Sequence, residues 1–460
     1  MKFELDEQSK RALELMDGEM PFVFITGRAG TGKSTLLRHY RDNAPRTVPV
    51  LAPTGVAALN VEGETIHKFF RFSPDITAKH ARRKGAAARD GMYAAIDRII
   101  IDEISMVRAD LMDCVDAFLR AAREDERPFG GVRIVAIGDL FQLPPVVTQH
   151  DKEAFTHLYT TPYFFSSNVV SELLDYGQVA FLELEKVHRQ KDKKFIEFLN
   201  GIRDQSITSE ALVELNRCVK TGSLPEDAIV LTPTNRAADA LNERRLLSLL
   251  PKAKKFKGHA SGDFGDREMP TDSELSLKRG ARVMCMVNDP AGAYVNGSLG
   301  WVSGFEDDGV KVDLDDGETV RVDMHTWNLY RNKYDERHGR IEAEKIGSFT
   351  QIPLRLAWAI TIHKSQGKTF DQAVIDLDRG AFAAGQVYVA LSRCRSLSGL
   401  RLTKPVTPDQ IMLDKDIVSF MDQLKGKGSG RLSLFGTAES RGRSVAPEEF
   451  AEPVYIEDPN

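Results

Sequence analysis

Short segments of continuous apolar residues recur along the chain, and each ends in Gly, Thr, Asp or Asn. Successive residues of a strand point to opposite faces, and in these segments the residues of both faces are apolar. This is typical of strands covered on both faces, as in a parallel sheet flanked by helices. Helical patterns lie between them, for example at 111–125, with apolar residues three and four positions apart. This alternation predicts βαβ units and an α/β fold. The strands are expected at 22–26, 48–54, 98–103, 133–139, 228–235 and 372–378.

The same pattern predicts how the chain divides into domains. It is clear from residue 22, weakens near 150 and returns near 180, which indicates two α/β domains. A two-residue alternation interrupted by two Asp-Asp-Gly turns predicts a small antiparallel β module. The polar, Gly- and Ser-rich end of the chain predicts disorder. The expected ranges are 1–177 for the first domain with an insertion at about 73–92, 178–296 and 349–425 for the second domain, 297–348 for the β module, and 426–460 for the tail.

Charge and cysteine content narrow the classes of partner and compartment. The 460 residues carry a formal net charge of −5, so a basic footprint over the whole surface is absent. Two basic clusters, 79–89 and 252–259, could still line a local positive groove, although solvated surface loops also carry such runs. The four cysteines lack metal-binding spacing, which favours a reduced, cytoplasmic setting. No apolar run reaches the roughly 20 residues of a membrane span, and no apolar signal core follows Met1.

The strongest chemical signal is GRAGTGKS at 27–34, which fits the phosphate-binding pattern G-x-x-x-x-G-K-[ST] at every fixed position. Glycines let backbone N–H groups turn toward phosphate oxygens, and the helix expected near Lys33 adds the positive end of its dipole. Lys33 supplies a charge at the outer phosphates, and Ser34 supplies a ligand for Mg²⁺. The motif therefore predicts a nucleotide site formed by Gly27, Gly30, Gly32, Lys33, Ser34 and Thr35.

Further candidates follow other expected strands. Asp102 and Glu103 end an apolar strand, which puts two carboxylates at the carboxyl edge of a parallel sheet, where ligands bind. Asp102 is the candidate for holding Mg²⁺, and Glu103 for orienting or deprotonating the attacking water. Gln142, in GDLFQLPPV, is a candidate for hydrogen-bonding the γ-phosphate. Arg189 and Arg393 are candidate arginine fingers, although each taken singly is also compatible with an ordinary surface salt bridge.

Taken in order, the motifs resemble those of a known family. The series LDEQSKRAL, GRAGTGKST, APTGVAALNVEGETIHKFF, IIDEISMV, GDLFQLPPV, KVHRQ, AITIHKSQGKTFD and VYVALSRCRS is similar to that of superfamily-one DNA helicases of the 5′-to-3′ class. GETIHKFF and the stretch at 111–133, which contains PFGG, resemble the petite-integration-frequency (PIF) family, bacterial type. The resemblance covers about residues 4–400. Leu140 departs from it, because an aromatic residue is commoner at that position.

This resemblance implies two RecA-like domains with ATP and Mg²⁺ between them and single-stranded DNA lying across both. One domain would move past the other in each hydrolysis cycle. The family pattern also implies that Gln8 reads the adenine, and that Gly367 lies near the phosphates and couples them to the DNA strand. It further implies that 297–348 form a small Src-homology-three-like barrel along the DNA channel, and that the insertion at 73–92 flanks the duplex junction.

Polar residues at expected strand ends are candidates for DNA contacts. The sequence Thr-Ile-His occurs at 65–67 in the first domain and again at 361–363 in the second. Hydroxyl, amide and imidazole groups in such places can position a phosphate backbone without reading its sequence. Phe69, Phe70 and Phe72 are either stacking surfaces for bases or core residues. The DNA-binding candidates are Pro53, Thr54, Gly55, Asn60, Thr65, His67, Thr361, His363, Lys364 and Ser365.

The resemblance predicts a nucleoid-associated 5′-to-3′ DNA helicase that acts in replication, recombination or repair on duplex or structured DNA, including G-quadruplexes. A P-loop ATPase that remodels without strand separation, and a helicase subunit of a larger complex, are the alternatives. RLSLF at 431–435 resembles the bacterial sliding-clamp-binding pentapeptide, with Arg431 in place of the usual Gln. By that resemblance Leu432, Leu434 and Phe435 would bind a hydrophobic pocket on the clamp. The alternatives are that the segment docks on its own protein or is an incidental apolar cluster.

Overall fold

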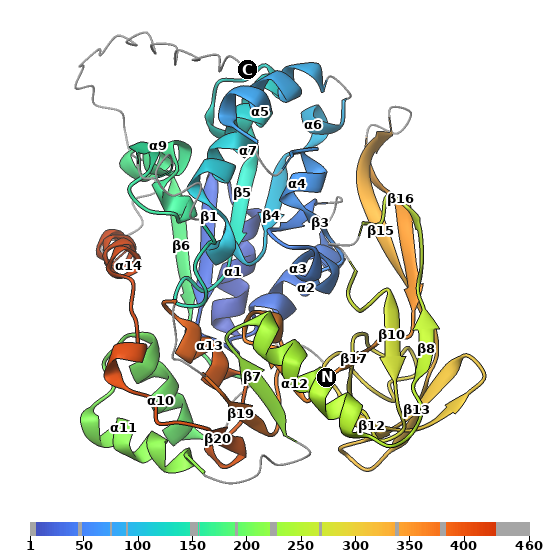
Figure 1. Cartoon of the computed structure of the whole chain (residues 1–460). Helices are drawn as coiled ribbons and strands as arrows, with labels where there is room; N and C mark the ends of the chain where they lie inside the picture. Colours follow the sequence, from blue (N-terminus) through green and yellow to red (C-terminus); the bar gives the residue numbers. More distant parts are fainter. Residues whose placement is uncertain are drawn as a thin grey trace, which may run out of the picture.

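The computed structural model describes residues 6–44, 48–73, 76–88, 91–147, 155, 157–188, 192–220, 228–265, 269–335, 340–377 and 383–428. Two parallel sheets with helices packed on them form the upper and lower parts of the molecule in Figure 1, and a mainly antiparallel β region lies beside them. The expected α/β fold is therefore confirmed. Within these ranges, no helix has both the length and the apolar character needed to cross a membrane.

The first sheet has six strands in the order β3-β2-β4-β5-β1-β6, and all neighbouring strands are parallel. Its strands are β1 (Phe22–Gly27), β2 (Val50–Ala52), β3 (Glu64–Thr65), β4 (Arg98–Ile101), β5 (Arg133–Ile137) and β6 (Val179–Leu184). The strands β1, β2 and β4 are buried along their whole length, as their continuous apolar sequences predicted. Because the strands are parallel, their carboxyl ends lie along one edge.

Helices and short 3-10 turns connect these strands. The helices are α1 (Glu7–Asp17), α2 (Lys33–Asn43), α3 (Gly55–Asn60), α4 (Ile66–Phe69), α5 (Ala78–Ala87), α6 (Met92–Ala95), α7 (Ala109–Arg123) and α9 (Asn168–Asp175). The 3-10 turns are η1 (Ile104–Met106), η2 (Pro128–Gly131) and η3 (Phe164–Ser166). The expected insertion at 73–92 contains α5, which packs so closely on α7 that a Cβ at Gly85 would lie 2.2 Å from the Phe118 carbonyl oxygen.

The second sheet has four parallel strands in the order β18-β7-β19-β20. They are β7 (Ile229–Thr232), β18 (Ala359–Thr361), β19 (Ala373–Ile375) and β20 (Leu400–Leu402). The helices that follow along this part of the chain are α10 (Lys193–Arg203), α11 (Ser209–Leu215), α12 (Asn235–Ser248), α13 (Gln386–Ser392) and α14 (Lys415–Gly428). Short turns are η4 (Asn216–Cys218), η6 (His363–Ser365), η7 (Leu397–Gly399) and η8 (Pro408–Gln410).

The antiparallel region is larger than the expected module at 297–348. A five-stranded sheet has the order β14-β13-β12-β11-β17, and a three-stranded sheet has the order β15-β16-β9, while β10 pairs with β8. The strands are β8 (Lys254–Lys257), β9 (His259–Gly262), β10 (Glu274–Leu277), β11 (Arg282–Cys285), β12 (Leu299–Glu306), β13 (Gly309–Leu314), β14 (Thr319–Val322), β15 (His325–Asp335), β16 (Arg340–Gln351) and β17 (Leu354–Leu356). The expected range missed β8, β9, β10 and β11 before it and β17 after it, because each has only three or four residues, too few for an alternation to stand out in the sequence.

Two expected domain boundaries need correction. The second domain was placed from residue 178, but β6 forms a parallel ladder with β1 from Phe22 to Gly27, so the first sheet continues to Leu184. The second domain was also expected to include the chain up to 425. Helix α14 instead returns to the first domain, where Phe420 stacks on Phe165 with ring centroids 4.1 Å apart. The chain therefore crosses between the domains after β6 and again before α14.

Aromatic residues fill the space between α4, α6 and α7. Phe69, Phe70 and Phe72 are 3%, 0% and 7% exposed, and they pack with Tyr93 and Phe118. Each such pair contributes about 0.5–1.5 kcal/mol beyond its buried area. These three residues were expected to be either stacking surfaces for bases or core residues. They are core residues, because their buried rings have no face open to a base.

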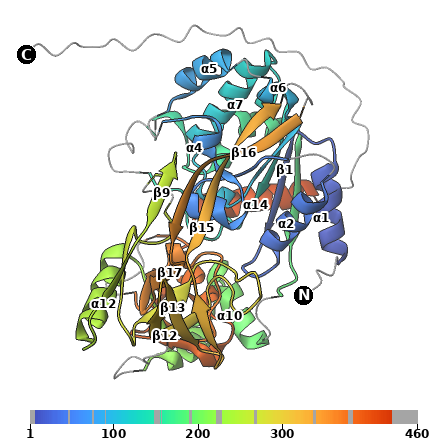
Figure 2. The same cartoon turned by 90° about the vertical axis from the view of Figure 1, so that its right-hand side faces the viewer.

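The β15–β16 hairpin extends from the antiparallel region to the first domain (Figure 2). Both strands contact α6, and β15 also contacts α4 and β3. Strand β3 carries Thr65 and helix α4 carries His67, and both residues are DNA-binding candidates. The hairpin thus lies beside the part of the first domain that was expected to contact DNA.

Candidate functional site

The loop after β1 has the backbone shape of a phosphate-binding loop. Gly30 and Gly32 have φ of +83° and +89°, a left-handed conformation that glycine adopts without strain. At Gly27, a Cβ would lie 2.6 Å from the carbonyl oxygen of Leu184, so β1 and β6 approach too closely for a larger residue. Because α2 begins at Lys33, directly after the loop, its free N–H groups and positive dipole end lie at the loop.

The ammonium group of Lys33 is held by the loop itself. Its Nζ donates to the carbonyl oxygens of Gly27 at 2.6 Å and Arg28 at 3.1 Å. Ser34 and Thr35, in the first turn of α2, are exposed. The loop therefore contains a positive charge, and hydroxyl groups beside it are accessible to a bound ion or nucleotide.

Asp102 and Glu103 follow β4 at the same edge of the sheet. Asp102 is buried, its N–H donates to the Leu51 carbonyl at 2.9 Å, and Glu103 has φ of +50°. Burial and the adjacent Glu103 raise the pKa of Asp102 to about 7, while Lys33 acts in the opposite direction. A bound cation would favour the charged form of this carboxylate. The oxygen donors of Ser34 and Asp102 fit Mg²⁺, which prefers such ligands.

The loop after β5 belongs to the first domain and contacts the second domain through side chains. Asp139 is fully buried, and its carboxylate accepts hydrogen bonds at 3.2 Å from both Arg203 on α10 and Tyr388 on α13. The Nε2 atom of Gln142 lies 3.4 Å from the same carboxylate. The Oε1 atom of Gln142 accepts from Gln366 of the second domain at 3.5 Å. Gln142, the candidate ligand of the γ-phosphate, thus has side-chain contacts in both domains.

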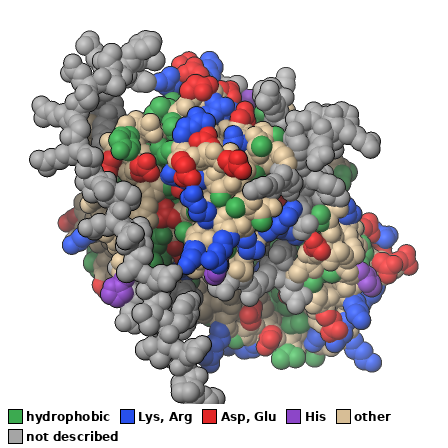
Figure 3. Space-filling view, turned by 90° about the horizontal axis from the view of Figure 1, so that it is seen from above, with side chains coloured by type: hydrophobic (Ala, Val, Ile, Leu, Met, Phe, Trp, Pro, Cys, Tyr) green, Lys and Arg blue, Asp and Glu red, His purple; other side chains and the backbone are tan. Residues whose placement is uncertain are grey.

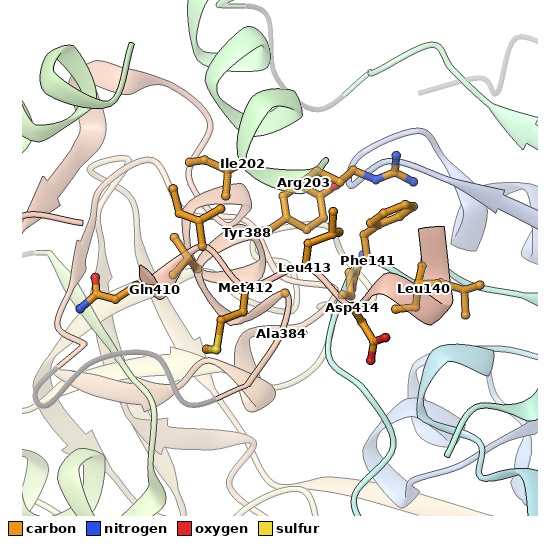
Figure 4. Close-up of a pocket in the computed structure, with 15 residues that line it drawn as sticks. Leu140, Phe141, Ile202, Arg203, Ala384, Tyr388, Gln410, Met412, Leu413 and Asp414 are labelled. Carbon is orange, nitrogen blue, oxygen red and sulfur yellow. The ribbon is translucent and has the colours of Figure 1, made fainter. Parts of the chain in front are cut away.

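A pocket lies at this junction (Figure 4). Its walls come from the β5 loop, α10, α13 and the segment before α14, with residues such as Leu140, Phe141, Ile202, Tyr388, Met412 and Asp414. Leu140, which departs from the family pattern, is fully buried beside Gln142. The pocket is therefore bounded by residues of both domains and by the segment through which the chain returns to the first domain before α14.

The segment after β6 lies against α1 and the phosphate-binding loop. The Oε1 atom of Gln8 accepts from the Glu185 N–H at 3.0 Å, and the His188 N–H donates to the Gly30 carbonyl at 2.9 Å. Gln8 and Gly30 are thus joined through one short segment. Arg189, the residue after His188, lies outside the described residues, and its role as an arginine finger stays a prediction.

Arg393 is 1% exposed at the end of α13. Its guanidinium donates to the carbonyl oxygens of Val389 at 3.0 Å, Ser365 at 3.3 Å and Lys368 at 3.4 Å. Gly367, within the same segment, is exposed and has φ of +75°. These contacts join Arg393 to the turn that carries the DNA-binding candidates of the second domain, and its part in hydrolysis stays a prediction.

The DNA-binding candidates of the first domain lie at the ends of two neighbouring strands, since Ala52 of β2 pairs with Thr65 of β3. Thr54 and Thr65 cap the helices that follow, by accepting from the N–H groups three residues later, each at 3.2 Å. Burial lowers the pKa of the half-buried His67, so its neutral form is favoured. The half-buried Pro53 and Gly55 lie beside Thr54, and α3 ends at Asn60.

The candidates of the second domain fall into two groups. Thr361 and Ser365 are buried, and they stabilise the η6 turn by bonding to the Lys364 N–H and the Ile362 carbonyl at 3.2 and 2.7 Å. Lys364 is exposed, and His363 is half-buried with a pKa that burial lowers. The surface groups of this turn are therefore His363 and Lys364, and the two hydroxyls shape the turn.

The basic cluster expected at 79–89 lies largely on α5. Lys79, Arg82, Arg83 and Lys84 are exposed, and Arg82 pairs with Glu126 at 2.8 Å. The end of the molecule viewed in Figure 3 carries both basic and acidic side chains. The cluster thus forms one side of a helix in a face of mixed charge.

Three residues of the junction were not singled out in the sequence. Asp139 and Tyr388 stand inside the quoted motifs GDLFQLPPV and YVALSRCRS, but their side chains had no expected partner. Arg203 ends an amphipathic helix, and nothing in its neighbourhood marks it. Their positions depend on how the two domains dock, so spacing along the chain carries no signal for them.

Comparison with known proteins gives a consistent family. Residues 7–212 match PIF1-like helicases. The ATP-dependent DNA helicase Pif1 of Bdellovibrio bacteriovorus is 33% identical over 438 residues, which cover 92% of this chain and 93% of that protein. ATP-dependent DNA helicase PIF1 of Homo sapiens is 35% identical, with 91% of this chain and 64% of the human protein covered. The chain thus spans less than two thirds of the human relative.

Solved structures of a Bacteroides relative share the fold. The crystal structure of Bacteroides sp Pif1 in complex with ADP-AlF4 has a TM-score of 0.83 at 34% identity, with 93% of this chain and 98% of that chain covered. Bacteroides Pif1 bound to ssDNA has the same identity and coverage but a TM-score of 0.65. The arrangement of this chain is therefore closer to the ADP-AlF4 complex than to the ssDNA complex.

Proposed function

Because the chain belongs to the PIF1-like helicase family, we propose that it uses ATP hydrolysis to move 5′ to 3′ along single-stranded DNA and to separate duplex or structured DNA, including G-quadruplexes. The observation that carries the proposal is the contact between Gln142, beside the nucleotide edge, and Gln366, which follows His363 and Lys364. Through this contact, a change at the nucleotide reaches the DNA-binding turn. Such an enzyme acts at the nucleoid in replication, recombination or repair.

The first domain supplies the groups that hydrolysis needs. Lys33 neutralises charge on the outer phosphates, and Glu103 orients or deprotonates the attacking water. Ser34 and Asp102 would hold Mg²⁺, which supplies further charge stabilisation at the phosphates when bound. Gln142 contacts the γ-phosphate. Arg189 and Arg393 come from beyond β6, so their contribution makes hydrolysis depend on how the second domain is docked.

The DNA strand lies across both domains in this proposal. Thr54, Thr65 and His67 contact it in the first domain, and His363 and Lys364 contact it in the second. These groups suit phosphate contacts, which position a strand without selecting its sequence. The β15–β16 hairpin lies against α4 and β3, so DNA binding is expected to move it. This chain has a lower TM-score against Bacteroides Pif1 bound to ssDNA, 0.65, than against the ADP-AlF4 complex, 0.83, which supports a change of overall arrangement when DNA binds.

Strand separation of matched duplexes with a 5′ tail, a 3′ tail or no tail tests the proposal. We expect ATP-dependent separation of the 5′-tailed duplex alone, because the family moves in that direction. Glu103→Gln, which keeps the size of the side chain, is the control and should abolish separation. Separation from the 3′ tail alone would contradict the polarity. DNA-stimulated ATP hydrolysis without any separation would favour the alternative, a remodelling ATPase or a subunit that needs a partner.

We propose further that the tail tethers the enzyme to a sliding clamp through RLSLF at 431–435. The sequence places Leu432, Leu434 and Phe435 in a polar, Gly- and Ser-rich segment, which suits capture of apolar side chains by a pocket. These residues lie outside the described part of the chain, so the support is the sequence alone. Arg431 removes one polar contact of the usual pentapeptide and weakens the expected affinity.

The clamp proposal is tested with the full chain and purified bacterial sliding clamp. Leu434→Ala with Phe435→Ala should weaken binding at least about tenfold, because each removes a buried apolar side chain from the complex. Ser433→Ala is the matched control and should bind like the wild type. Unwinding of a 5′-tailed duplex without clamp should be unchanged in all three proteins. Equal clamp binding by the double variant would exclude the pentapeptide as the contact.

A further inference from the structure

Tyr388 joins two parts of the first domain although it belongs to the second. Its hydroxyl accepts a hydrogen bond from the Ala29 N–H of the phosphate-binding loop at 2.8 Å, and it donates to Oδ2 of Asp139 at 3.2 Å. Tyr388 and Asp139 are 3% and 0% exposed, so water does not compete for these bonds. One hydroxyl therefore connects the phosphate-binding loop to the loop that carries Gln142.

The chemistry of these two bonds requires a neutral phenol. Burial and the nearby carboxylate of Asp139 raise the pKa of Tyr388 well above its ordinary value, so the hydroxyl keeps its proton. A protonated hydroxyl has one donor and can also accept, which matches the acceptor Asp139 and the donor Ala29. Phenylalanine would fill the same space but would leave both groups without this partner.

Arg203 completes the junction from α10. Its guanidinium lies 3.2 Å from Oδ1 of Asp139 and 3.4 Å from Glu183 on β6, and it stacks over Phe141 at 4.1 Å from the ring centroid. Figure 4 shows Arg203, Phe141 and Tyr388 close together. Since Arg203 occupies Oδ1 of Asp139, the other oxygen is held toward Tyr388 and Gln142. The arrangement forms only when the second domain is docked.

We propose that Tyr388 is a positioning residue for ATP hydrolysis. When the second domain docks, its hydroxyl fixes the position of the phosphate-binding loop relative to the loop that carries Gln142. This inference rests on the proposed function and adds a residue to it. Tyr388 acts through Ala29 and Asp139, so it affects the rate of the reaction more than the affinity for nucleotide. Loss of its hydroxyl should therefore lower kcat and leave KM for ATP and Kd for ssDNA close to the wild-type values.

The test compares Tyr388→Phe with Tyr163→Phe in ssDNA-stimulated ATP hydrolysis. Tyr163 is a matched control, because it is also a buried tyrosine whose hydroxyl donates to a carboxylate, that of Asp414 directly before α14 at 2.8 Å, and within the described residues it contacts neither the phosphate-binding loop nor Asp139. For Tyr388→Phe we expect kcat about tenfold lower, the rate equivalent of one buried hydrogen bond, with KM and ssDNA Kd within about twofold. For Tyr163→Phe we expect kcat within about twofold of the wild type.

The double variant Tyr388→Phe with Asp139→Asn, compared with the two single variants, tests whether Tyr388 acts on hydrolysis through Asp139. If both residues act through one unit, its kcat should equal that of the slower single variant. Unchanged kcat in Tyr388→Phe, an equal loss in Tyr163→Phe, or fully multiplicative losses in the double variant would overturn the inference. Absence of ssDNA-stimulated hydrolysis in the wild type would overturn the proposed function as well, so the two failures are distinguishable.

Discussion

Replacing Lys33 with alanine is expected to lower kcat for ssDNA-stimulated ATP hydrolysis by about 10²–10³-fold, which is the usual effect of removing one fixed charge-stabilising group. The Lys33 ammonium is already held in the loop by the carbonyl oxygens of Gly27 and Arg28. It therefore reaches the phosphates without a large rearrangement, and its charge counts fully in the transition state. Strand separation of the 5′-tailed duplex should be lost, because each step depends on hydrolysis.

The same substitution should change the pH dependence of the remaining activity. Burial and Glu103 raise the pKa of Asp102 to about 7, and Lys33 lowers it. Without Lys33 this pKa rises further, so more of Asp102 is protonated at pH 7 and fewer molecules can hold Mg²⁺. The kcat of Lys33→Ala should therefore increase between pH 7 and pH 9 more steeply than that of the wild type.

Steady-state hydrolysis at saturating ATP over this pH range measures both effects. Arg38→Ala, which removes an exposed cation from the same helix, is the control and should stay within about twofold of the wild type. Equal pH profiles for Lys33→Ala and the wild type would show that Lys33 does not act on Asp102. A kcat loss below about tenfold would show that another cation replaces Lys33 at the phosphates.

The parts of the site that are local in the sequence were predictable. A loop between a strand and a helix needs glycine where φ is positive, and Gly30 and Gly32 have that conformation. The carboxylates of Asp102 and Glu103 had to follow β4, because a continuous apolar strand ends there. Both features depend on a few neighbouring residues, so spacing alone is enough to find them.

Features that depend on docking between distant elements were not predictable. The bond between Ala29 and Tyr388 joins residues 359 positions apart, and no motif spacing encodes it. Thr361 and Ser365 were expected to contact DNA, yet both are buried and stabilise their own turn. A hydroxyl at a strand end suits either role. Only the packing around it decides which one it takes.

Helix α14 carries the second large expected effect, since it belongs to the core of the first domain. Ile417, Phe420, Met421 and Leu424 are between 2% and 5% exposed. Phe420 also contacts the rings of Phe24 and Phe164 with centroids 6.2 and 6.1 Å away. At the helix end, Lys425 pairs with Glu183 at 2.8 Å. The predicted tail, which starts at residue 426, would remove the last three residues of this helix, because α14 ends at Gly428.

Phe420→Ala is expected to destabilise the first domain by about 3–5 kcal/mol, the usual cost of removing a buried phenyl ring. For a domain of this size, that corresponds to a fall in Tm of roughly 10 °C. Gln423→Ala, at an exposed position on the same helix, should leave Tm unchanged. Thermal unfolding of the two variants and the wild type, followed by circular dichroism, measures the difference. Equal Tm values would show that α14 is not part of the cooperative core.

Two truncated chains test where the first domain ends along the sequence. A chain ending at residue 428 keeps α14 and should retain the wild-type Tm and ATP hydrolysis. A chain ending at 414 exposes the apolar surface that α14 covers, so it should aggregate or unfold at a much lower temperature. It also leaves the chain crossing between the domains only once, after β6. If the 414 chain kept its Tm but lost ssDNA-stimulated hydrolysis, α14 would serve to fix the domain arrangement and would contribute little to folding.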